Sequence, residues 1–85
     1  MTMPAEVLET LRNRCWQLRN QIRQADNLSV PVAPGRWRWA DVKGSYGRKS
    51  EQELAADRER NRQLAVTLRQ KLAQVEAYLK EQLTP

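Results

Sequence analysis

Two stretches of regularly spaced apolar residues, separated by a segment that holds all three glycines, restrict this chain to a helical hairpin. Apolar residues recur every three or four positions in each stretch, which is the spacing of one face of a helix. The repeating positions are Leu8, Leu11, Cys15, Leu18, Ile22 and Ala25, then Ala65, Leu68, Leu72, Val75 and Leu79. We predict a single all-α domain with helices over about residues 4–27 and 51–83 and a long irregular connector over 28–50.

The starts of both predicted helices carry local signals. Pro4 suits the first turn of a helix, where its missing N–H group is not needed. Ser50 followed by Glu53 has the S-x-x-E spacing of a capping box, and Leu54 then opens the apolar pattern. The connector between these helices is longer than most connections in compact domains, and such long connections are usually functional or disordered.

The core of one 85-residue hairpin is small, since 40% of the residues are hydrophobic and none is Phe. Leu64 and Tyr78 lie beside the second apolar stripe and widen it. We therefore expect oligomerisation to complete a helical bundle, most simply as an antiparallel four-helix dimer. The predicted oligomer interface is Leu64, Leu68, Leu72, Val75, Tyr78 and Leu79.

The two predicted helices differ in length by roughly 15 Å at 1.5 Å per residue, so part of the second must extend beyond the first. Residues 55–63 are poor in apolar side chains, which places the overhang at the start of the second helix. This charged stretch can be a solvated face, or a polar contact surface beside the connector. A third interpretation is that Asn61 lies in the helix–helix seam and fixes its register.

The composition argues against catalysis, metal binding and membrane insertion. The chain has no His and one Cys, so the commonest general base, the commonest metal ligand and any intrachain disulfide are missing. Cys15 lies in the first stripe and is expected to be a small buried hydrophobe. We predict a non-enzymatic protein without cofactor or metal. No apolar run suits a membrane span and the first residues lack a signal-peptide pattern, so a cytoplasmic location is the default expectation.

The connector concentrates positive charge and aromatic rings. It holds five Lys/Arg residues against one acid, Asp41, which accounts for +4 of the net charge of +5. Arg36, Trp37, Arg38 and Trp39 alternate, so an extended segment would place both arginines on one side and both rings on the other. Such a layout suits a single nucleic-acid strand, because rings stack on bases while guanidinium groups hold phosphates. Alternatively, one or both Trp side chains cap the open end of the bundle.

The end of the connector combines glycines, a hydroxyl and cations with the start of a helix, which are the components of a phosphate cradle. Glu51 and Glu53 would repel an anion at the helix terminus itself, so we expect Arg48 and Lys49 to meet any phosphate. In the first helix, Arg12, Arg19 and Arg23 form a basic edge beside the apolar stripe. Trp16 is one position off this stripe, where it either widens the core or contacts a partner.

Two functions follow from these patterns. The first is an accessory protein that binds nucleic acid, and the second is an adaptor or assembly subunit that docks onto a larger protein complex, since Trp and Arg are also typical of protein-binding hot spots. Binding to a membrane surface ranks third. The predicted partner-binding residues are Arg36, Trp37, Arg38, Trp39, Lys43, Tyr46, Arg48, Lys49, Arg12, Arg19 and Arg23.

Overall fold

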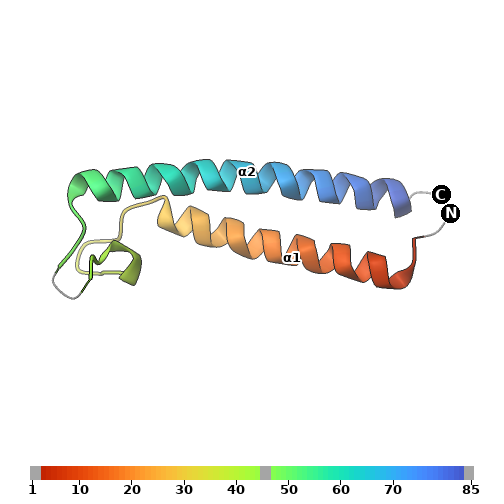
Figure 1. Cartoon of the computed structure of the whole chain (residues 1–85), viewed down its shortest axis with the longest axis horizontal. Coiled ribbons are helices and arrows are strands. Elements are labelled where there is room, and N and C mark those ends of the chain that lie inside the picture. The colour runs from red at the N-terminus through yellow and green to blue at the C-terminus, as the bar shows by residue number, and fades with distance from the viewer. Residues whose placement is uncertain (1–2, 45–46, 84–85) are drawn as a thin grey trace.

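Two helices lie side by side in opposite directions and the connector closes one end of the hairpin (Figure 1). The computed structural model describes residues 3–44 and 47–83. Helix α1 spans Ala5–Leu28 and helix α2 spans Glu51–Leu83, with a short 3₁₀ helix, η1, over Trp39–Asp41 in the connector. Within the described ranges there is no β-strand, only an isolated antiparallel bridge between Val42 and Arg48. The predicted all-α two-helix architecture is confirmed, with helix ends within one residue of those expected.

Both predicted start signals lie at helix starts, but Pro4 caps α1 from outside its first turn, and the Glu53 carboxylate of the predicted capping box pairs with Lys43. Pro4 immediately precedes α1, and its carbonyl oxygen accepts a hydrogen bond from the backbone N–H of Leu8 at 3.0 Å. The Ser50 hydroxyl accepts a hydrogen bond from the backbone N–H of Glu53 at 3.2 Å. This bond satisfies one of the amide donors that the first turn of α2 leaves unpaired.

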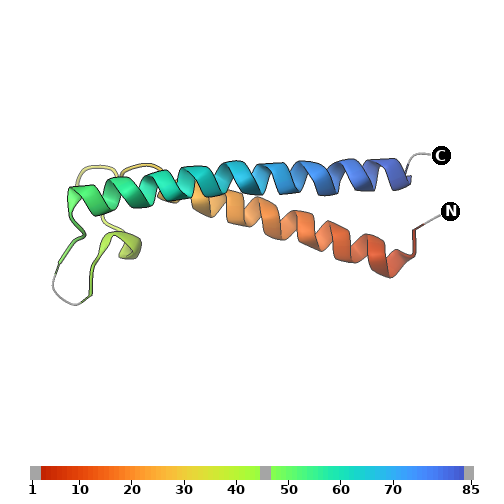
Figure 2. The same ribbon diagram turned by 45° about the horizontal axis from the view of Figure 1, so that its top comes forward.

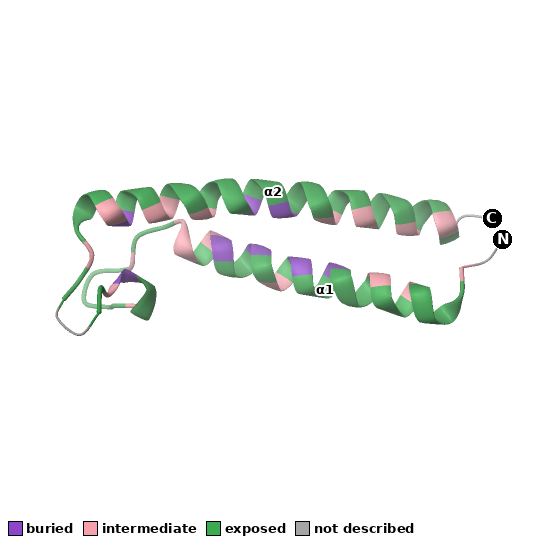
Figure 3. Cartoon of the chain, in the orientation of Figure 1, coloured by how far each residue is buried: buried purple, intermediate pink, exposed green. Residues whose placement is uncertain are grey.

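The core is a single seam between the two helices (Figure 3). Leu18, Ile22 and Ala25 of α1 meet Ala65 and Leu68 of α2. Leu18 is fully buried, and removing such a side chain from water contributes roughly 1.5–3 kcal/mol. Leu72 and Val75 pack against this cluster but keep part of their surface exposed. The seam therefore buries the middle of each predicted stripe, whereas Leu8, Leu11 and Leu79, towards the end opposite the connector, are only half-buried.

Cys15 in the α1 stripe and Trp16 beside it differ sharply in exposure. Cys15 is 3% exposed, which agrees with its predicted role as a small buried hydrophobe. Trp16 is 66% exposed and therefore does not widen the core. Across the seam, Arg69 of α2 forms an ion pair with Asp26 of α1 and Arg19 lies 3.8 Å from Glu76, so charged pairs border the apolar stripe.

The first turns of α2 extend beyond the end of α1, on the side where the connector lies (Figures 1 and 2). The position of the overhang agrees with the prediction from residues 55–63. Leu54 lies in this overhang, yet it is 6% exposed and separate from the main core cluster. The connector is the part of the chain that surrounds this end of the hairpin, so it covers the apolar start of α2.

The charged stretch of α2 is partly a solvated face with local pairs and partly a polar contact surface beside the connector, because Lys49 of the connector binds Asp57. Arg60 pairs with Asp57 and Arg62 pairs with Glu59, each one turn away along the helix. The Asn61 amide donates to the carbonyl oxygen of Asp57 at 2.9 Å, which is a bond within α2. Because this hydrogen bond does not cross to α1, the observed contacts of Asn61 do not support a role in fixing the register.

Candidate functional site

The connector makes a tight turn over residues 33–36, a few residues after the end of α1. The backbone N–H of Arg36 donates to the carbonyl oxygen of Ala33 at 3.1 Å, and Gly35 has a φ of 80°. Pro at the second position and a glycine with positive φ at the third are the signature of a type II turn. The Arg36 side chain follows this turn, exposed to solvent and with no side-chain partner among the described residues.

Arg38 is held by two other parts of the chain. Its Nε donates to Oδ2 of Asp41 at 2.9 Å, and its Nη1 donates to the carbonyl oxygen of Asn27 at 2.7 Å. Asp41 is 7% exposed, the one buried charged residue within the described ranges. The sequence predicts a partner contact for Arg38, but these bonds occupy its guanidinium in holding η1 against the end of α1.

Trp37 and Trp39 form an exposed pair. Their ring centroids lie 4.6 Å apart, and their planes meet at 88°, an edge-to-face arrangement. Trp37 is 61% exposed and Trp39 is 77% exposed. The rings therefore contact each other and solvent, and the alternative in which they cap the open end of the helices is not the arrangement observed.

The second half of the connector is tied to α2 by two lysines. Lys49 Nζ lies 2.5 Å from Oδ2 of Asp57, and Lys43 Nζ lies 3.2 Å from Oε1 of Glu53. Two backbone hydrogen bonds flank the bridge between Val42 and Arg48. The N–H of Lys43 donates to the carbonyl oxygen of Gly47 at 2.7 Å, and the N–H of Lys49 donates to the backbone carbonyl oxygen of Asp41 at 2.8 Å.

These contacts divide the predicted cations of the connector into two groups. The side chains of Arg38, Lys43 and Lys49 are paired within the chain, whereas Arg36 and Arg48 are exposed and have no partner among the described residues. Tyr46, the remaining connector residue predicted to bind a partner, lies outside the described residues.

The predicted basic edge of α1 borders a groove on one flank of the hairpin. Arg12 and Arg19 lie on either side of Trp16 in a groove of about 550 Å³ that Leu79 of α2 also lines. Arg23 is exposed further along α1. Because Arg19 is partly engaged by Glu76, the edge carries less free charge than the sequence suggests.

The residues predicted to form an oligomer interface differ in how far they are buried within the hairpin. Leu68 belongs to the core of the hairpin itself, and Leu72, Val75 and Leu79 are half-buried along the same stripe. Leu64 and Tyr78 are 47% and 48% exposed. Of the six, these two are therefore the side chains that a second copy could reach without disturbing the hairpin.

Two acidic residues that organise the site are not among the predicted site residues. In the sequence, Asp41 is notable only as the one acid among five cations of the connector. Its spacing of three from Arg38 is nevertheless a local signal for an ion pair. Asp57 binds Lys49 across eight positions of sequence, and no spacing rule predicts that contact.

No family model, curated protein or solved structure matches this chain. Over residues 3–44 and 47–83, no group of three or more His, Cys, Asp or Glu side chains is arranged to hold a metal ion. Neither described helix combines the length and hydrophobicity that crossing a membrane requires. Any functional assignment must therefore come from the geometry of the connector and the helix flanks.

Proposed function

We propose that this chain is a non-catalytic accessory protein that binds a single strand of nucleic acid through its connector. The exposed pair of Trp37 and Trp39, directly after the unpaired Arg36, is the observation that carries this proposal. Large rings are costly to expose on a small protein that has few apolar groups for its core, so their exposure favours a role in binding.

The Trp pair offers exposed rings on which the bases of a single nucleic-acid strand can stack. Stacking on an aromatic ring contributes roughly 1–3 kcal/mol per base and tolerates any base, because each base presents a π-face. The rings meet edge to face, so they present differently oriented surfaces to solvent. Bases of a single strand can be splayed to follow such surfaces, whereas the bases of a duplex remain stacked on each other.

The remaining cations supply phosphate contacts. Arg36 and Arg48 have no partner among the described residues, so they can bind phosphate oxygens without giving up a bond to that part of the chain. Lys43 can contribute after exchanging Glu53 for a phosphate, since both groups are substantially exposed and such surface pairs contribute little to stability. Phosphate binding is therefore expected to depend chiefly on Arg36 and Arg48.

Binding of a mixed-sequence single-stranded oligonucleotide at low salt tests the proposal. Replacing Trp37 or Trp39 by Ala should weaken binding by roughly 1–3 kcal/mol if each ring stacks a base. Trp16→Ala provides a matched control, because Trp16 is also exposed but lies on α1. Absence of binding at low salt to single strands and duplexes alike would reject the proposal and favour the adaptor function.

A second candidate function is assembly with another protein, most simply a second copy of this chain. The large apolar side chains left exposed along the helix flanks favour it, among them Trp16, Leu64 and Tyr78. The groove beside Trp16, with a volume of about 550 Å³, offers a site for an apolar side chain of the partner. Light scattering at micromolar concentration tests self-association, and a monomer with a cooperative melt would reject it.

A further inference from the structure

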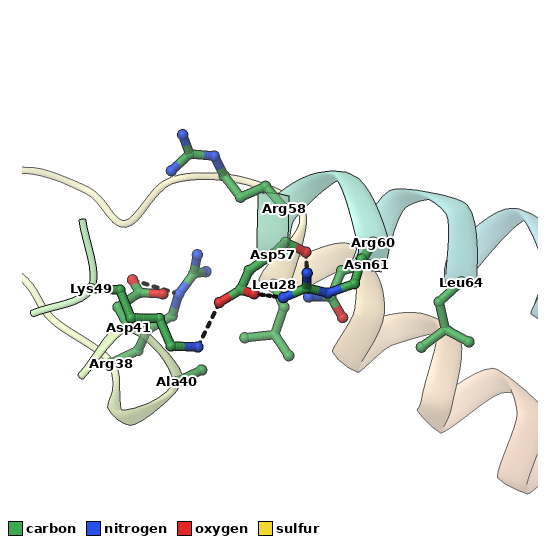
Figure 4. Close-up of a pocket in the computed structure, with 10 residues that line it drawn as sticks. All are labelled: Leu28, Arg38, Ala40, Asp41, Lys49, Asp57, Arg58, Arg60, Asn61 and Leu64. Atoms are coloured by element: carbon green, nitrogen blue, oxygen red, sulfur yellow. Dashed lines mark hydrogen bonds and ion pairs between the residues drawn. The ribbon is translucent and has the colours of Figure 1, made fainter. Parts of the chain in front are cut away.

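A second cavity, separate from the groove beside Trp16, lies where the end of α1, the connector and the start of α2 meet (Figure 4). Its volume is about 380 Å³, at the lower end of the roughly 300–1,000 Å³ typical of small-molecule sites. Six charged side chains line it: Arg38, Asp41, Lys49, Asp57, Arg58 and Arg60. Four positive and two negative groups give this lining a net charge of +2.

The two carboxylates do not neutralise the four cations. Asp41 is engaged by Arg38, which leaves Asp57 as the single acid for the rest of the cavity. Both Lys49 and Arg60 bind Asp57, one to each carboxylate oxygen. One negative charge is therefore shared between two positive ones, and one positive charge remains in excess.

Arg58 provides the second excess charge. It is partly buried and has no hydrogen bond or ion pair among the described residues. Figure 4 shows its side chain extending from α2 apart from the contacts of Lys49, Asp57 and Arg60. An unpaired guanidinium at a cavity wall is a ready donor for a ligand oxygen, because all its N–H groups can turn to the ligand without breaking a bond.

Partial burial strengthens the charge of four of these groups, whereas Arg60 is 72% exposed at the rim. The side chains of Asp57 and Lys49 are 19% and 29% exposed, and those of Asp41 and Arg38 are 10% and 21% exposed. Charges act more strongly on a ligand when less water surrounds them. The cavity thus combines a net positive charge with partly buried charged groups.

We infer that this cavity binds a phosphate monoester. A phosphate monoester carries a charge of about −1.5 to −2 at neutral pH, which balances the cavity, whereas an internal phosphodiester carries one charge and would leave it positive. Guanidinium groups bind phosphate oxygens in paired hydrogen bonds, so Arg58 and Arg60 would contribute geometry as well as charge.

Two sources share this chemistry: a free mononucleotide and the phosphorylated end of a nucleic-acid strand. Binding of a strand end would make the proposed function more specific, and it depends on that function being correct. Binding of a free mononucleotide is independent of the proposed function. The cavity opens between the connector and α2, and η1 contributes both Trp39 of the stacking pair and Asp41 of the cavity. A strand stacked on the rings would thus meet the same short element that borders the cavity.

Calorimetric titration of the whole chain with adenosine monophosphate and with inorganic phosphate, at constant ionic strength, tests the cavity directly. Arg58→Gln and Arg60→Gln should each weaken binding by roughly 10-fold to 100-fold, the loss of one hydrogen bond to a charged group. Arg14→Gln is the matched control, since it removes the same charge from an exposed arginine of α1 without a partner among the described residues. The control should bind like the unchanged chain.

Oligonucleotides of one sequence with a 5′-phosphate, a 3′-phosphate or two hydroxyl ends separate the sources. If a phosphorylated strand binds more tightly than the strand with two hydroxyl ends, and Arg58→Gln abolishes this difference, the ligand is the strand end. If all three oligonucleotides bind equally while adenosine monophosphate still binds, the ligand is the free mononucleotide. If no strand binds but the mononucleotide does, the proposed function fails and the cavity stands. Two results would overturn the inference. The first is that neither the mononucleotide nor phosphate binds and the three strands bind equally. The second is that the Arg58→Gln and Arg14→Gln variants have the same affinity.

Discussion

Arg38 and Asp41 form an ion pair of 2.9 Å inside the connector, and the same guanidinium also binds the last turn of α1 through the Asn27 carbonyl. A side chain expected to face a partner therefore holds the connector in place. Arg36, two positions earlier, is exposed and has no such bonds. The alternating arginines thus differ: Arg38 holds the connector to α1, while Arg36 is exposed without a partner among the described residues.

Arg38→Ala should destabilise the protein, because it leaves the Asp41 carboxylate, 10% exposed, without its charged partner. An unsatisfied buried group of this kind costs roughly 1–3 kcal/mol, more when it is charged. Arg36→Ala is the control and should change the free energy of unfolding by less than about 0.5 kcal/mol. Chemical denaturation followed by circular dichroism measures both, and equal stabilities would contradict the assignment of Arg38.

The salt dependence of nucleic-acid binding should depend on the two unpaired connector arginines. The double change Arg36→Ala/Arg48→Ala should reduce the slope of log affinity against log salt by up to roughly two units, one for each phosphate that the variant no longer binds. Arg62→Ala removes an exposed arginine that already pairs with Glu59 and should leave the slope unchanged. Fluorescence anisotropy at several salt concentrations provides the measurement, and an unchanged slope in the double variant would exclude a phosphate-binding role for these two arginines.

The cap of α2 should contribute measurably to stability. Ser50→Ala removes the acceptor for the backbone N–H of Glu53 and should cost roughly 0.5–2 kcal/mol. Ser50→Asp keeps a side-chain oxygen at the same position and should retain most of the stability. Thermal unfolding of the two variants compares them directly, and a similar loss in both would show that the hydroxyl bond is not what stabilises this helix start.

Assembly and folding can be separated by two changes on α2. Leu64→Asp places a charge on an exposed flank and should dissociate a dimer while the monomer still melts cooperatively. Leu68→Asp places the charge in the hairpin core and should unfold the chain whether or not it assembles. Light scattering combined with circular dichroism distinguishes these outcomes. A Leu64→Asp variant that associates as strongly as the unchanged chain would move the interface elsewhere.

The helical part of the structure follows from spacing alone, because each helix has to bury one continuous stripe. Cys15, Leu18 and Leu68 are buried where the repeat places them, and the overhang of α2 follows from the helix lengths. The connector depends on a different kind of contact. The spacing of three between Arg38 and Asp41 is a local signal for one pair. The contacts of Lys43 and Lys49 with α2 are set by how the segment folds back, and no local pattern in the sequence specifies them.

The helices set a fixed separation between the ends of the hairpin. Helix α1 begins and α2 ends at the same end, opposite the connector, and the molecule is 57 Å long (Figure 1). Any surface, label or further protein joined at the Ala5 and Leu83 end is therefore separated from Trp37 and Trp39 by the length of the helices, which is roughly 36 Å for α1 at 1.5 Å per residue. Immobilising the hairpin at that end leaves the connector, with its exposed aromatic pair, at the opposite end of the molecule.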